Sequence, residues 1–504
     1  MTSPLQQAPT VGTAMDTTAE QFDVIIIGAG VTGLYALHRL RERGFSVRIF
    51  ESGDGVGGTW YWNRYPGARF DSESYTYGYS FSQELLQEWE WQEHYAGQPE
   101  TERYLNYVAD KFDLRRDISL RSHVHSVVFD ESANAWQVFL ADGRQARARF
   151  VITAVGSLSA YYIPDFEGLD SFQGTWCHTG RWPAAGMDLA GKRVGVIGTG
   201  ATGVQLITAI APEVGHLTVF QRTANYCAPL RNGPIDPETQ RQIKASYPEI
   251  FQKCSETAGS FIHQFDPRSA MSVSPEERLE QYERLWTEPG FKKWLSNFYD
   301  VMLPGEANED YAAFVRQKIR ERVKDPVIAE KLVPKDHMFG SKRLPCESGY
   351  YEVFNQDNVE LVDVREAPIE RITPTGVKTK AAEYALDVII FATGYDAVTG
   401  PLNRIEIRGE GGQTLKDKFA EGPRTYMGIQ SVGFPNLFTI NAASVGNFVR
   451  AAEPLVDWVC ECIGYVRAHQ MTRIAPAPEA EAAWTQHVAE AGAKILRTQA
   501  NSWF

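Results

Sequence analysis

The chain lacks the features that mark membrane-spanning and exported proteins. It contains no run of about 18 apolar residues, which is the length that a membrane-spanning helix needs. The first twenty residues, MTSPLQQAPTVGTAMDTTAE, have neither a basic start nor an apolar stretch. They predict a flexible tail and not a signal peptide. We therefore expect a cytoplasmic protein with no role at a membrane.

Cysteine and positive charge are also scarce. The six cysteines include no Cys-x-x-Cys pair, which predicts reduced thiols, excludes dithiol redox chemistry and argues against a metal site. Lys and Arg total 50 against 63 for Asp and Glu, so the net charge is −13. This balance argues against a nucleic-acid partner.

A glycine-rich turn near the N-terminus is the first strong motif. The stretch FDVIIIGAGVTGLYALHRLRERGFSVRIFE predicts a buried strand, then Gly28, Gly30 and Gly33 in G-x-G-x-x-G spacing, a helix and a second strand. Such a turn offers backbone N–H groups and a helix dipole to a pyrophosphate. Glu51 follows the second strand, where a carboxylate accepts hydrogen bonds from ribose hydroxyls. The unit predicts an FAD site, and an ordinary βαβ unit is the alternative.

A second glycine-rich turn lies in KRVGVIGTGATGVQLITAIAPEVGHLTVFQRT. After its second strand the acid is replaced by Gln221 and Arg222, and an arginine there binds a 2′-phosphate that an acid would repel. This site therefore suits NADP(H), and the alternative for Arg222 is a solvated surface cation. The residues expected at the turn are Gly198, Thr199, Gly200, Ala201, Thr202 and Gly203.

Two different dinucleotide sites in one chain indicate hydride transfer from nicotinamide to flavin. We predict an α/β protein with two Rossmann-like dinucleotide-binding domains, for FAD and NADP, and a helical insertion in the NADP domain. VITAVGS (151–157) and FATGYD (391–396) are the expected crossovers between them. The expected divisions are a tail (1–20), the FAD domain (21–155 and 389–504), the NADP domain (156–225 and 341–388) and the insertion (226–340).

The insertion carries helical patterns. SPEERLEQYERLW (274–286) begins with a capping serine, a proline and a glutamate three residues after the cap. FKKWLSNFYDVML (291–303) and NEDYAAFVRQKIRERV (308–323) also have apolar residues at three- and four-residue spacing. The basic string RQKIRERVKD predicts mostly a solvated helix face. We find no catalytic cluster in this region.

Three further motifs carry a family resemblance. FQGTWCHTGRWP (172–183) matches F-x-G-x-x-x-H-x-x-x-W-P without a gap, GGTWYWNRYPGARFD spans 57–71, and SKRLPCESGYYEVFN spans 341–355. With these motifs the chain resembles the type I Baeyer–Villiger monooxygenases, from about residue 21 to the end. The likeness is greatest to members that act on cyclic ketones.

The resemblance implies a reaction. NADPH reduces FAD, O2 adds at flavin C4a, and the peroxide inserts one oxygen beside a ketone carbonyl to give an ester or lactone. The peroxide must stay deprotonated, which requires a fixed cation and a site closed to water. Arg343 is the candidate cation, and Asp71 is expected to orient it. The alternatives are a surface cation for Arg343 and a turn residue for Asp71.

The resemblance implies roles for other residues. Lys342 is expected to bind the NADP phosphate with Arg222, and His178 to fix the linker motif by a hydrogen bond, without transferring a proton. Val124 lies in SHVHSVVF, whose alternation suggests an edge strand, and a plain core valine is as good an interpretation. Additional cofactor contacts are expected at Thr59, Trp60, Tyr77 and Trp503.

The C-terminal part departs from the family pattern. NAASVGNFVRAA (441–452) is shorter than the usual loop and lacks its Gly-Pro content, although Asn447 and Phe448 are expected near the ketone. The sequence given ends at NSWF, just after Trp503, which matches a tryptophan on a lid that reaches NADP. We expect either omitted segments or a reduced lid.

Two other functions remain open from the sequence. The first is a flavin-dependent monooxygenase that oxidises nitrogen or sulfur, and Trp182-Pro183 argues for the ketone-oxidising group over it. The second is a redox-sensing flavoprotein without turnover, which would leave Lys342, Arg343 and the loop around Trp60 without purpose. The sequence does not specify the oligomeric state.

Overall fold

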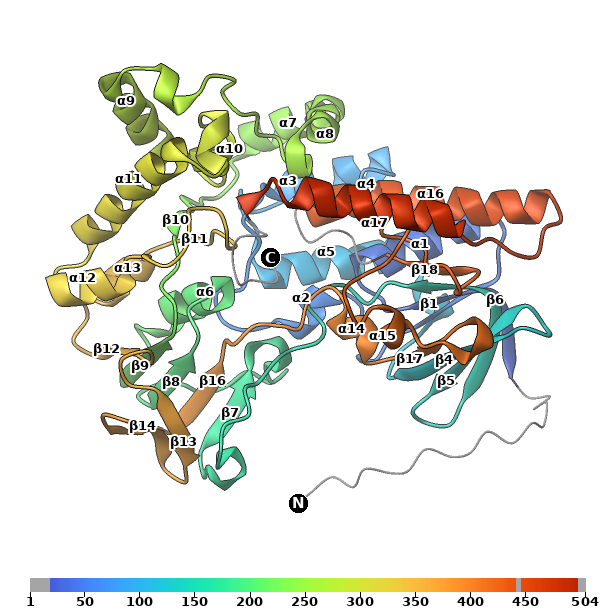
Figure 1. Ribbon diagram of the computed structural model, residues 1–504, viewed down its shortest axis with the longest axis horizontal. Coiled ribbons are helices and arrows are strands. Elements are labelled where there is room, and N and C mark those ends of the chain that lie inside the picture. Colours follow the sequence, from blue (N-terminus) through green and yellow to red (C-terminus); the bar gives the residue numbers. More distant parts are fainter. Residues whose placement is uncertain (1–18, 441–445, 497–504) are drawn as a thin grey trace.

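Two sheets organise the chain. The computed structural model describes residues 19–440 and 446–496. An eight-stranded sheet lies on the right of Figure 1 and a five-stranded sheet on the left, with a helical region above the latter. Both sheets contain a strand–glycine turn–helix–strand unit, so the expected α/β fold with Rossmann-like units is confirmed.

The larger sheet has the order β17-β4-β5-β6-β1-β2-β3, with β18 also paired to β6. Its centre is parallel, because β1 pairs in parallel with both β2 and β6, whereas β4, β5 and β6 form an antiparallel meander. The strands are β1 (Glu20–Ile27), β2 (Val47–Phe50), β3 (Ile118–Ser119), β4 (Val124–Asp130), β5 (Ala135–Leu140), β6 (Gln145–Thr153), β17 (Glu406–Arg408) and β18 (Leu437–Thr439).

The smaller sheet is wholly parallel and has the order β12-β9-β8-β16-β7. Its strands are β7 (Thr175–His178), β8 (Arg193–Ile197), β9 (His216–Gln221), β12 (Val359–Asp363) and β16 (Val388–Phe391). A three-stranded antiparallel sheet adjoins it, formed by β13 (Ile369–Thr373), β14 (Gly376–Thr379) and β15 (Glu383–Ala385).

The central strands form because their residues are apolar on both faces. Val24, Ile25 and Ile26 of β1 are fully buried, as are Ile389 and Ile390 of β16. Helices that cover both faces of a parallel sheet require this continuous apolar pattern. Around the larger sheet these helices are α1 (Val31–Glu42), α5 (Gln98–Lys111) and α16 (Phe448–Ala468), and α6 (Ala201–Ile210) covers the smaller sheet.

The helical region above the smaller sheet uses the capping that the sequence predicts. The Ser274 hydroxyl accepts a hydrogen bond from the Glu277 backbone N–H, and Pro275 occupies the first helical position. The helices are α7 (Pro237–Ala245), α8 (Tyr247–Glu256), α9 (Pro275–Trp286), α10 (Lys292–Leu295), α11 (Glu306–Arg322), α12 (Pro326–Leu332) and α13 (Tyr350–Val353).

Three expectations from the sequence need correction. The 291–303 stretch is not one helix: α10 ends at Leu295 because the Asn297 side chain donates to the Lys293 carbonyl and accepts from the Phe298 N–H. Strand β4 is not at an edge, since β17 pairs with it from far along the chain. Strand β16 holds residues 389–391 in the smaller sheet, so the chain leaves that sheet after 391 and not after 388.

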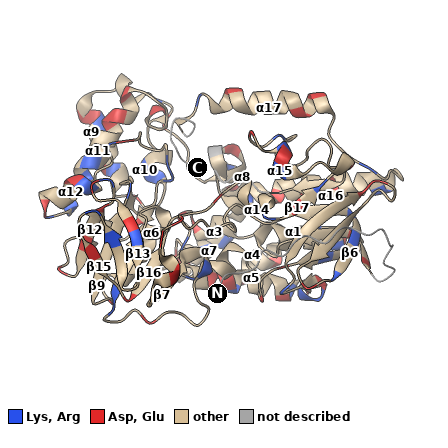
Figure 2. Cartoon of the chain, turned by 60° about the horizontal axis from the view of Figure 1, so that its bottom comes forward, with Lys and Arg blue, Asp and Glu red and all other residues tan. Residues whose placement is uncertain are grey.

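The surface mixes both signs of charge. Figure 2 shows basic and acidic residues interspersed along α9, α11 and α12. In the basic string of α11, Arg316 and Arg320 pair with Glu309 and Glu330. Such pairs at the surface contribute little to stability. Of the helices in the described part of the chain, none is long and apolar enough to cross a membrane.

Candidate functional site

The first glycine turn closes against the strand beside it. Gly28 has φ of +104°, and a Cβ there would lie 2.7 Å from the Ala154 carbonyl oxygen. A Cβ on Gly33 would lie 1.9 Å from the Gly28 carbonyl oxygen, so α1 packs directly on the turn. The first backbone conformation and the second close approach both require glycine.

The second turn repeats this geometry. Gly198 has φ of +112°, and its Cβ would lie 2.4 Å from the Ala392 carbonyl oxygen. A Cβ on Gly203 would lie 2.2 Å from the Gly198 carbonyl oxygen. Ala154 and Ala392 belong to the two crossovers, so each turn is covered by the chain as it leaves a sheet. Both turns therefore have the open backbone cradle that a pyrophosphate needs.

Glu51 is fixed at the end of β2. Its Oε2 accepts a hydrogen bond from the Ala29 N–H at 2.8 Å, and its Oε1 accepts one from the Gly53 N–H at 2.7 Å. The side chain is buried and lines the cavity beside the first turn. The carboxylate is thus held beside the glycine turn, in the position where a ribose would meet it.

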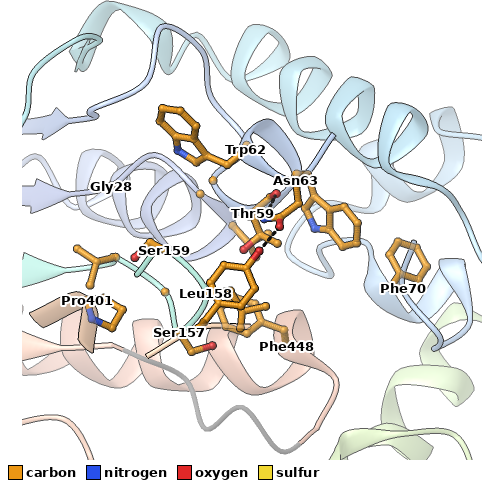
Figure 3. A pocket seen from close by; sticks show the side chains of 18 of the residues that line it. Gly28, Thr59, Trp62, Asn63, Phe70, Ser157, Leu158, Ser159, Pro401 and Phe448 are labelled. Atoms are coloured by element: carbon orange, nitrogen blue, oxygen red, sulfur yellow. Dashed lines mark hydrogen bonds between the residues drawn. The ribbon is translucent and has the colours of Figure 1, made fainter. Parts of the chain in front are cut away.

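A cavity of about 680 Å³ joins the two halves of the molecule. Figure 3 shows its wall from Gly28 across Thr59 and Asn63 to Phe448. Phe70 lies at the end nearest the helical region in that view. The predicted site residues that line the cavity are Gly28, Gly30, Glu51, Thr59, Trp60, Asp71, Tyr77, Val124, Gly200, Ala201, Thr202, Lys342 and Arg343.

Arg343 and Asp71 meet across this cavity. Arg343 Nη2 lies 3.0 Å from Asp71 Oδ2, and the Cys346 backbone N–H also points to that oxygen at 3.4 Å. The Asp71 side chain is 1% exposed, whereas that of Arg343 is 43% exposed and faces the open space. The arrangement gives a cation that is held at one guanidinium nitrogen by a buried carboxylate and is partly exposed to the cavity, where an anionic partner could meet it.

Burial changes the pKa of the Asp71 carboxyl. It raises the pKa of this carboxyl above its usual range, while the guanidinium of Arg343 opposes the rise. The Asp71 Oδ1 atom is buried and has no hydrogen-bond partner among the described residues. Burial of the charged Asp71 carboxylate therefore costs free energy of folding. This cost points to a role in orienting Arg343 and not to a gain in stability.

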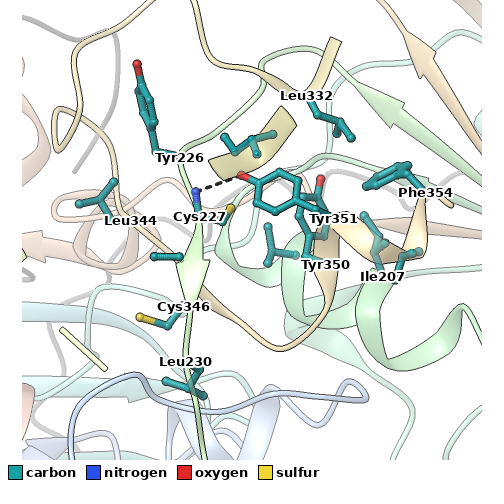
Figure 4. Packing of buried hydrophobic residues seen from close by; sticks show 14 of the residues in the cluster. Ile207, Tyr226, Cys227, Leu230, Leu332, Leu344, Cys346, Tyr350, Tyr351 and Phe354 are labelled. Atoms are coloured by element: carbon teal, nitrogen blue, oxygen red, sulfur yellow. Dashed lines mark hydrogen bonds between the residues drawn. The ribbon is translucent and has the colours of Figure 1, made fainter. Parts of the chain in front are cut away.

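The backbone around Arg343 is fixed by the hydrophobic core. Figure 4 shows Leu344 and Cys346 packed among buried residues of the lobe that is built on the smaller sheet (the smaller lobe). Both residues are more than nine-tenths buried. Strand β11 (Cys346–Glu347) pairs with β10 (Ala228–Pro229), and Asn225 Nδ2 donates to the Arg343 carbonyl at 3.0 Å. These contacts hold the start of the guanidinium-bearing side chain in place.

Aromatic side chains cover one side of the cavity. Trp60 belongs to the short helix α2 (Thr59–Trp62), and its Nε1 donates to the Tyr77 hydroxyl at 3.0 Å. Tyr77, at the end of α3 (Ser74–Tyr77), also stacks on Phe70 with ring centroids 4.3 Å apart. Burial raises the pKa of Tyr77 to about 12, so this hydroxyl stays protonated. The cluster brings Trp60 and Tyr77, two of the expected cofactor contacts, together on one wall of the cavity.

A second cavity, of about 850 Å³, contains Arg222, and Lys342 lines both cavities. Gln221 lies outside both: its amide donates to the Lys331 carbonyl, and its side chain is buried. Thr199 likewise donates to the Thr223 carbonyl. Trp503 lies outside the described residues, as does the first part of the 441–452 loop.

The linker motif is packed against the crossover from the smaller sheet. His178 Nδ1 accepts a hydrogen bond from the Gly180 N–H at 3.0 Å, as expected of a residue that fixes the linker. Its ring contacts Tyr161 and Tyr395. Burial lowers the pKa of His178 to about 4, so the ring is neutral at physiological pH. The ring does not line the cavity. Its hydrogen bond agrees with a structural duty.

Several residues of the site escaped the sequence analysis. Arg181 of the linker motif lies over the Trp62 ring at 4.2 Å and lines the cavity. Phe261 and Phe291 of the helical region line it as well. No local pattern could identify the phenylalanines, because apolar residues in a helical region read as core. For Arg181, its place inside the linker motif was the available signal.

Comparison with known proteins identifies the family. A model of NAD(P)-binding Rossmann-like domains matches residues 26–88. The 2-oxo-Δ3-4,5,5-trimethylcyclopentenylacetyl-CoA monooxygenase of Pseudomonas putida is 46% identical, over 96% of this chain and 90% of its own length. A Baeyer–Villiger monooxygenase of Pseudooceanicola batsensis is 42% identical, over 97% and 90%. The chain belongs to the Baeyer–Villiger monooxygenases. A phenazine N-monooxygenase of Lysobacter antibioticus is also similar, at 41% identity over 97% and 91%.

Solved structures of this family agree with the fold. A crystal structure of OTEMO in complex with FAD and NADP has a TM-score of 0.94 and 46% identity, over 96% of this chain and 93% of that one. An oxidised steroid monooxygenase bound to NADP has a TM-score of 0.92 and 48% identity, with the same coverage. The expected family, fold and enzyme class are therefore confirmed.

Proposed function

We propose that this Baeyer–Villiger monooxygenase uses FAD, NADPH and O2 to convert ketones, most of them cyclic, to lactones or esters. The ketone preference rests on the relatives, one of which is named for a cyclopentenyl compound. The FAD and NADP assignments rest on the two glycine turns and on relatives solved with both cofactors. When bound, FAD supplies the oxygen activation and NADPH the hydride.

The first cavity is the proposed flavin site. Its glycine turn and the N-terminus of α1 would bind the pyrophosphate, and Glu51 would bind the ribose. Trp60, Tyr77 and Val124 line the same cavity and would contact the cofactor. We assign the larger sheet to FAD and the smaller sheet to NADP. The helical region 226–340 forms part of the wall.

Arg222 and Lys342 are the proposed ligands of the NADP 2′-phosphate. Both line the second cavity, and Lys342 also reaches the first. Two cations from segments far apart in the sequence can hold a phosphate only when the segments lie close together. They would therefore hold the adenosine half of NADPH at the second cavity.

Arg343 is the proposed catalytic cation. It carries a permanent positive charge to the open space beside Phe291, at 5.8 Å from the ring centroid. Asp71 orients it from a buried position, and the aromatic cover limits the entry of water. A cation at this place stabilises the negative charge that develops next to the bound ring. The ketone lies between Arg343, Asn447 and Phe448.

The Arg343–Asp71 pair at 3.0 Å is the observation that carries this proposal. The test incubates the purified enzyme with NADPH, O2 and a series of linear, monocyclic and fused-ring ketones. We expect ketone-stimulated NADPH oxidation with a lactone or ester as the product. NADPH oxidation without any such product, for every ketone in the series, would contradict the proposal.

A second candidate function is oxidation of an aromatic nitrogen. The similarity to a phenazine N-monooxygenase, over nearly the whole chain, favours this possibility specifically. A phenazine, a sulfide and a cyclic ketone tested side by side at equal concentration distinguish the two. An N-oxide formed at a higher kcat/KM than the lactone would reverse the order of the candidates.

A further inference from the structure

A buried contact between a carboxylate and an imidazole lies next in the chain to the Asp71–Arg343 pair. Glu73 follows Asp71 by two residues, and its Oε1 is 2.9 Å from His263 Nε2. The two side chains are 6% and 2% exposed. The Tyr95 hydroxyl donates to the same oxygen at 3.4 Å, and Nε2 of His263 has no other polar partner among the described residues. Neither member of the pair lines the cavity.

The pair connects two remote parts of the chain. Glu73 immediately precedes α3, on the segment that carries Asp71, whereas His263 lies in the helical region after α8. The segment 257–263 that contains His263 is also held at its middle, where the Gly259 carbonyl accepts from the Asn447 N–H at 2.7 Å. The segment is therefore fixed from two sides, once by the start of α16 and once by Glu73.

The side chain placed by this segment is Phe261. It lines the cavity two residues before His263 and packs edge-on against Phe291, with centroids 5.0 Å apart. Phe291 in turn lies under the Arg343 guanidinium. A shift of the 257–263 segment would thus move the wall that faces the catalytic cation.

Stability does not explain the pair. Two polar groups buried together gain little stability over apolar residues of the same volume, because both groups lose their hydration. Two groups held at this distance in a dry interior do, however, fix the relative position of their backbones. We propose that Glu73 and His263 are positioning residues that set Phe261 and thereby the fit of the ketone. This inference rests on the proposed ketone oxidation.

Steady-state kinetics of variants test the inference. His263→Ala and Glu73→Ala should each raise KM for a cyclic ketone on the order of tenfold, because small misplacements in a site are costly. KM for NADPH and the FAD content per chain should stay within about twofold of the wild type. The double variant should be no worse than either single variant, since the two residues act as a unit. Glu73→Gln keeps an acceptor for the imidazole and should retain most of the ketone affinity.

Asp310→Asn is the matched control, because it breaks the Arg278–Asp310 pair (2.8 Å) in the same helical region, and neither residue lines the cavity. It should leave KM for the ketone unchanged. If the alanine variants do not fold, His263→Gln replaces them. A rise confined to the ketone supports the inference. Equal rises for ketone and NADPH, or none, overturn it. A wild-type enzyme that oxygenates no ketone would instead overturn the proposed function.

Discussion

The two glycine turns have the same backbone conformation, and their units differ in the residue that follows the second strand. Gly28 and Gly198 have φ values of +104° and +112°, and each lies under a crossover alanine. Glu51, after the first unit, is buried and fixed by two backbone N–H groups. Arg222, after the second, is exposed and lines a polar cavity. In the proposed function this one frame holds two different cofactors, and the residue after the second strand distinguishes them.

This difference suggests how cofactor recognition is divided between the larger lobe, built on the larger sheet, and the smaller lobe, built on the smaller sheet. The same turn geometry suits a pyrophosphate in either lobe, so it does not by itself distinguish FAD from NADP. Charge at the ribose position makes that distinction. The proposed oxygen chemistry needs a third element, a cation at the junction of the lobes, and Arg343 of the smaller lobe contacts Asp71 of the larger lobe there.

The largest expected effect is at this junction. Arg343→Ala should reduce ester formation by a factor on the order of 10²–10³, because one preorganised electrostatic group is lost. Reduction of the flavin by NADPH should persist, since both glycine turns are intact. Stopped-flow absorbance measures the reduction, and gas chromatography measures the product. An unchanged ester yield would remove the catalytic role of Arg343.

The two glycine turns can be disrupted separately, one in each lobe. Gly33→Ala should weaken FAD binding by about tenfold or more, because the new Cβ meets the Gly28 carbonyl and the backbone must move. Gly203→Ala should weaken NADPH binding to a similar extent and leave the FAD content near normal. Equilibrium titration of each cofactor provides the measurement. Gly464→Ala in α16, where a Cβ meets nothing within 4 Å, is the control.

The third prediction concerns the proposed role of Arg222 in selecting NADPH over NADH. Arg222→Ala should raise KM for NADPH by about 10- to 100-fold, the value of one charge-assisted contact. KM for NADH should change little, since NADH has no 2′-phosphate. Initial rates with the two cofactors measure both constants. Equal changes for NADPH and NADH would refute the phosphate role.

The smallest effect concerns stability. Because burial raises the pKa of Asp71, the neutral carboxyl stabilises the fold at low pH, and that contribution is lost as pH rises through the raised pKa. At about pH 8, Asp71→Asn should therefore keep Tm equal or raise it by about 1–2 °C. Ester formation should nevertheless fall. Differential scanning calorimetry measures Tm, and a destabilisation that grows with rising pH would contradict the account.

The sequence was sufficient for the parts of the site that local pattern encodes. Both glycine turns, the capping at Ser274 and the crossovers could be predicted, because each depends on residues close in the chain. The contact between Asp71 and Arg343 was expected only through the family resemblance, since nothing local relates positions 71 and 343.

Tertiary pairing decides the features that could not be predicted. The sequence of β4 predicts an edge strand, but β17 pairs with it in the folded chain. The 291–303 stretch reads as a helix until Asn297 bonds to the backbone on both sides. The sequence around Phe261 predicts a core residue, whereas the fold places its side chain at the cavity.

The central claim is that one oxygen atom of O2 enters a ketone at the junction of the two lobes, under the charge of Arg343. The most direct test supplies isotopically labelled O2 to the enzyme with NADPH and a cyclic ketone, and analyses the product by mass spectrometry. The account predicts a lactone with one labelled oxygen from the wild type and almost none from Arg343→Ala. Equal labelled lactone from both proteins, or hydrogen peroxide as the sole product of the wild type, would contradict it.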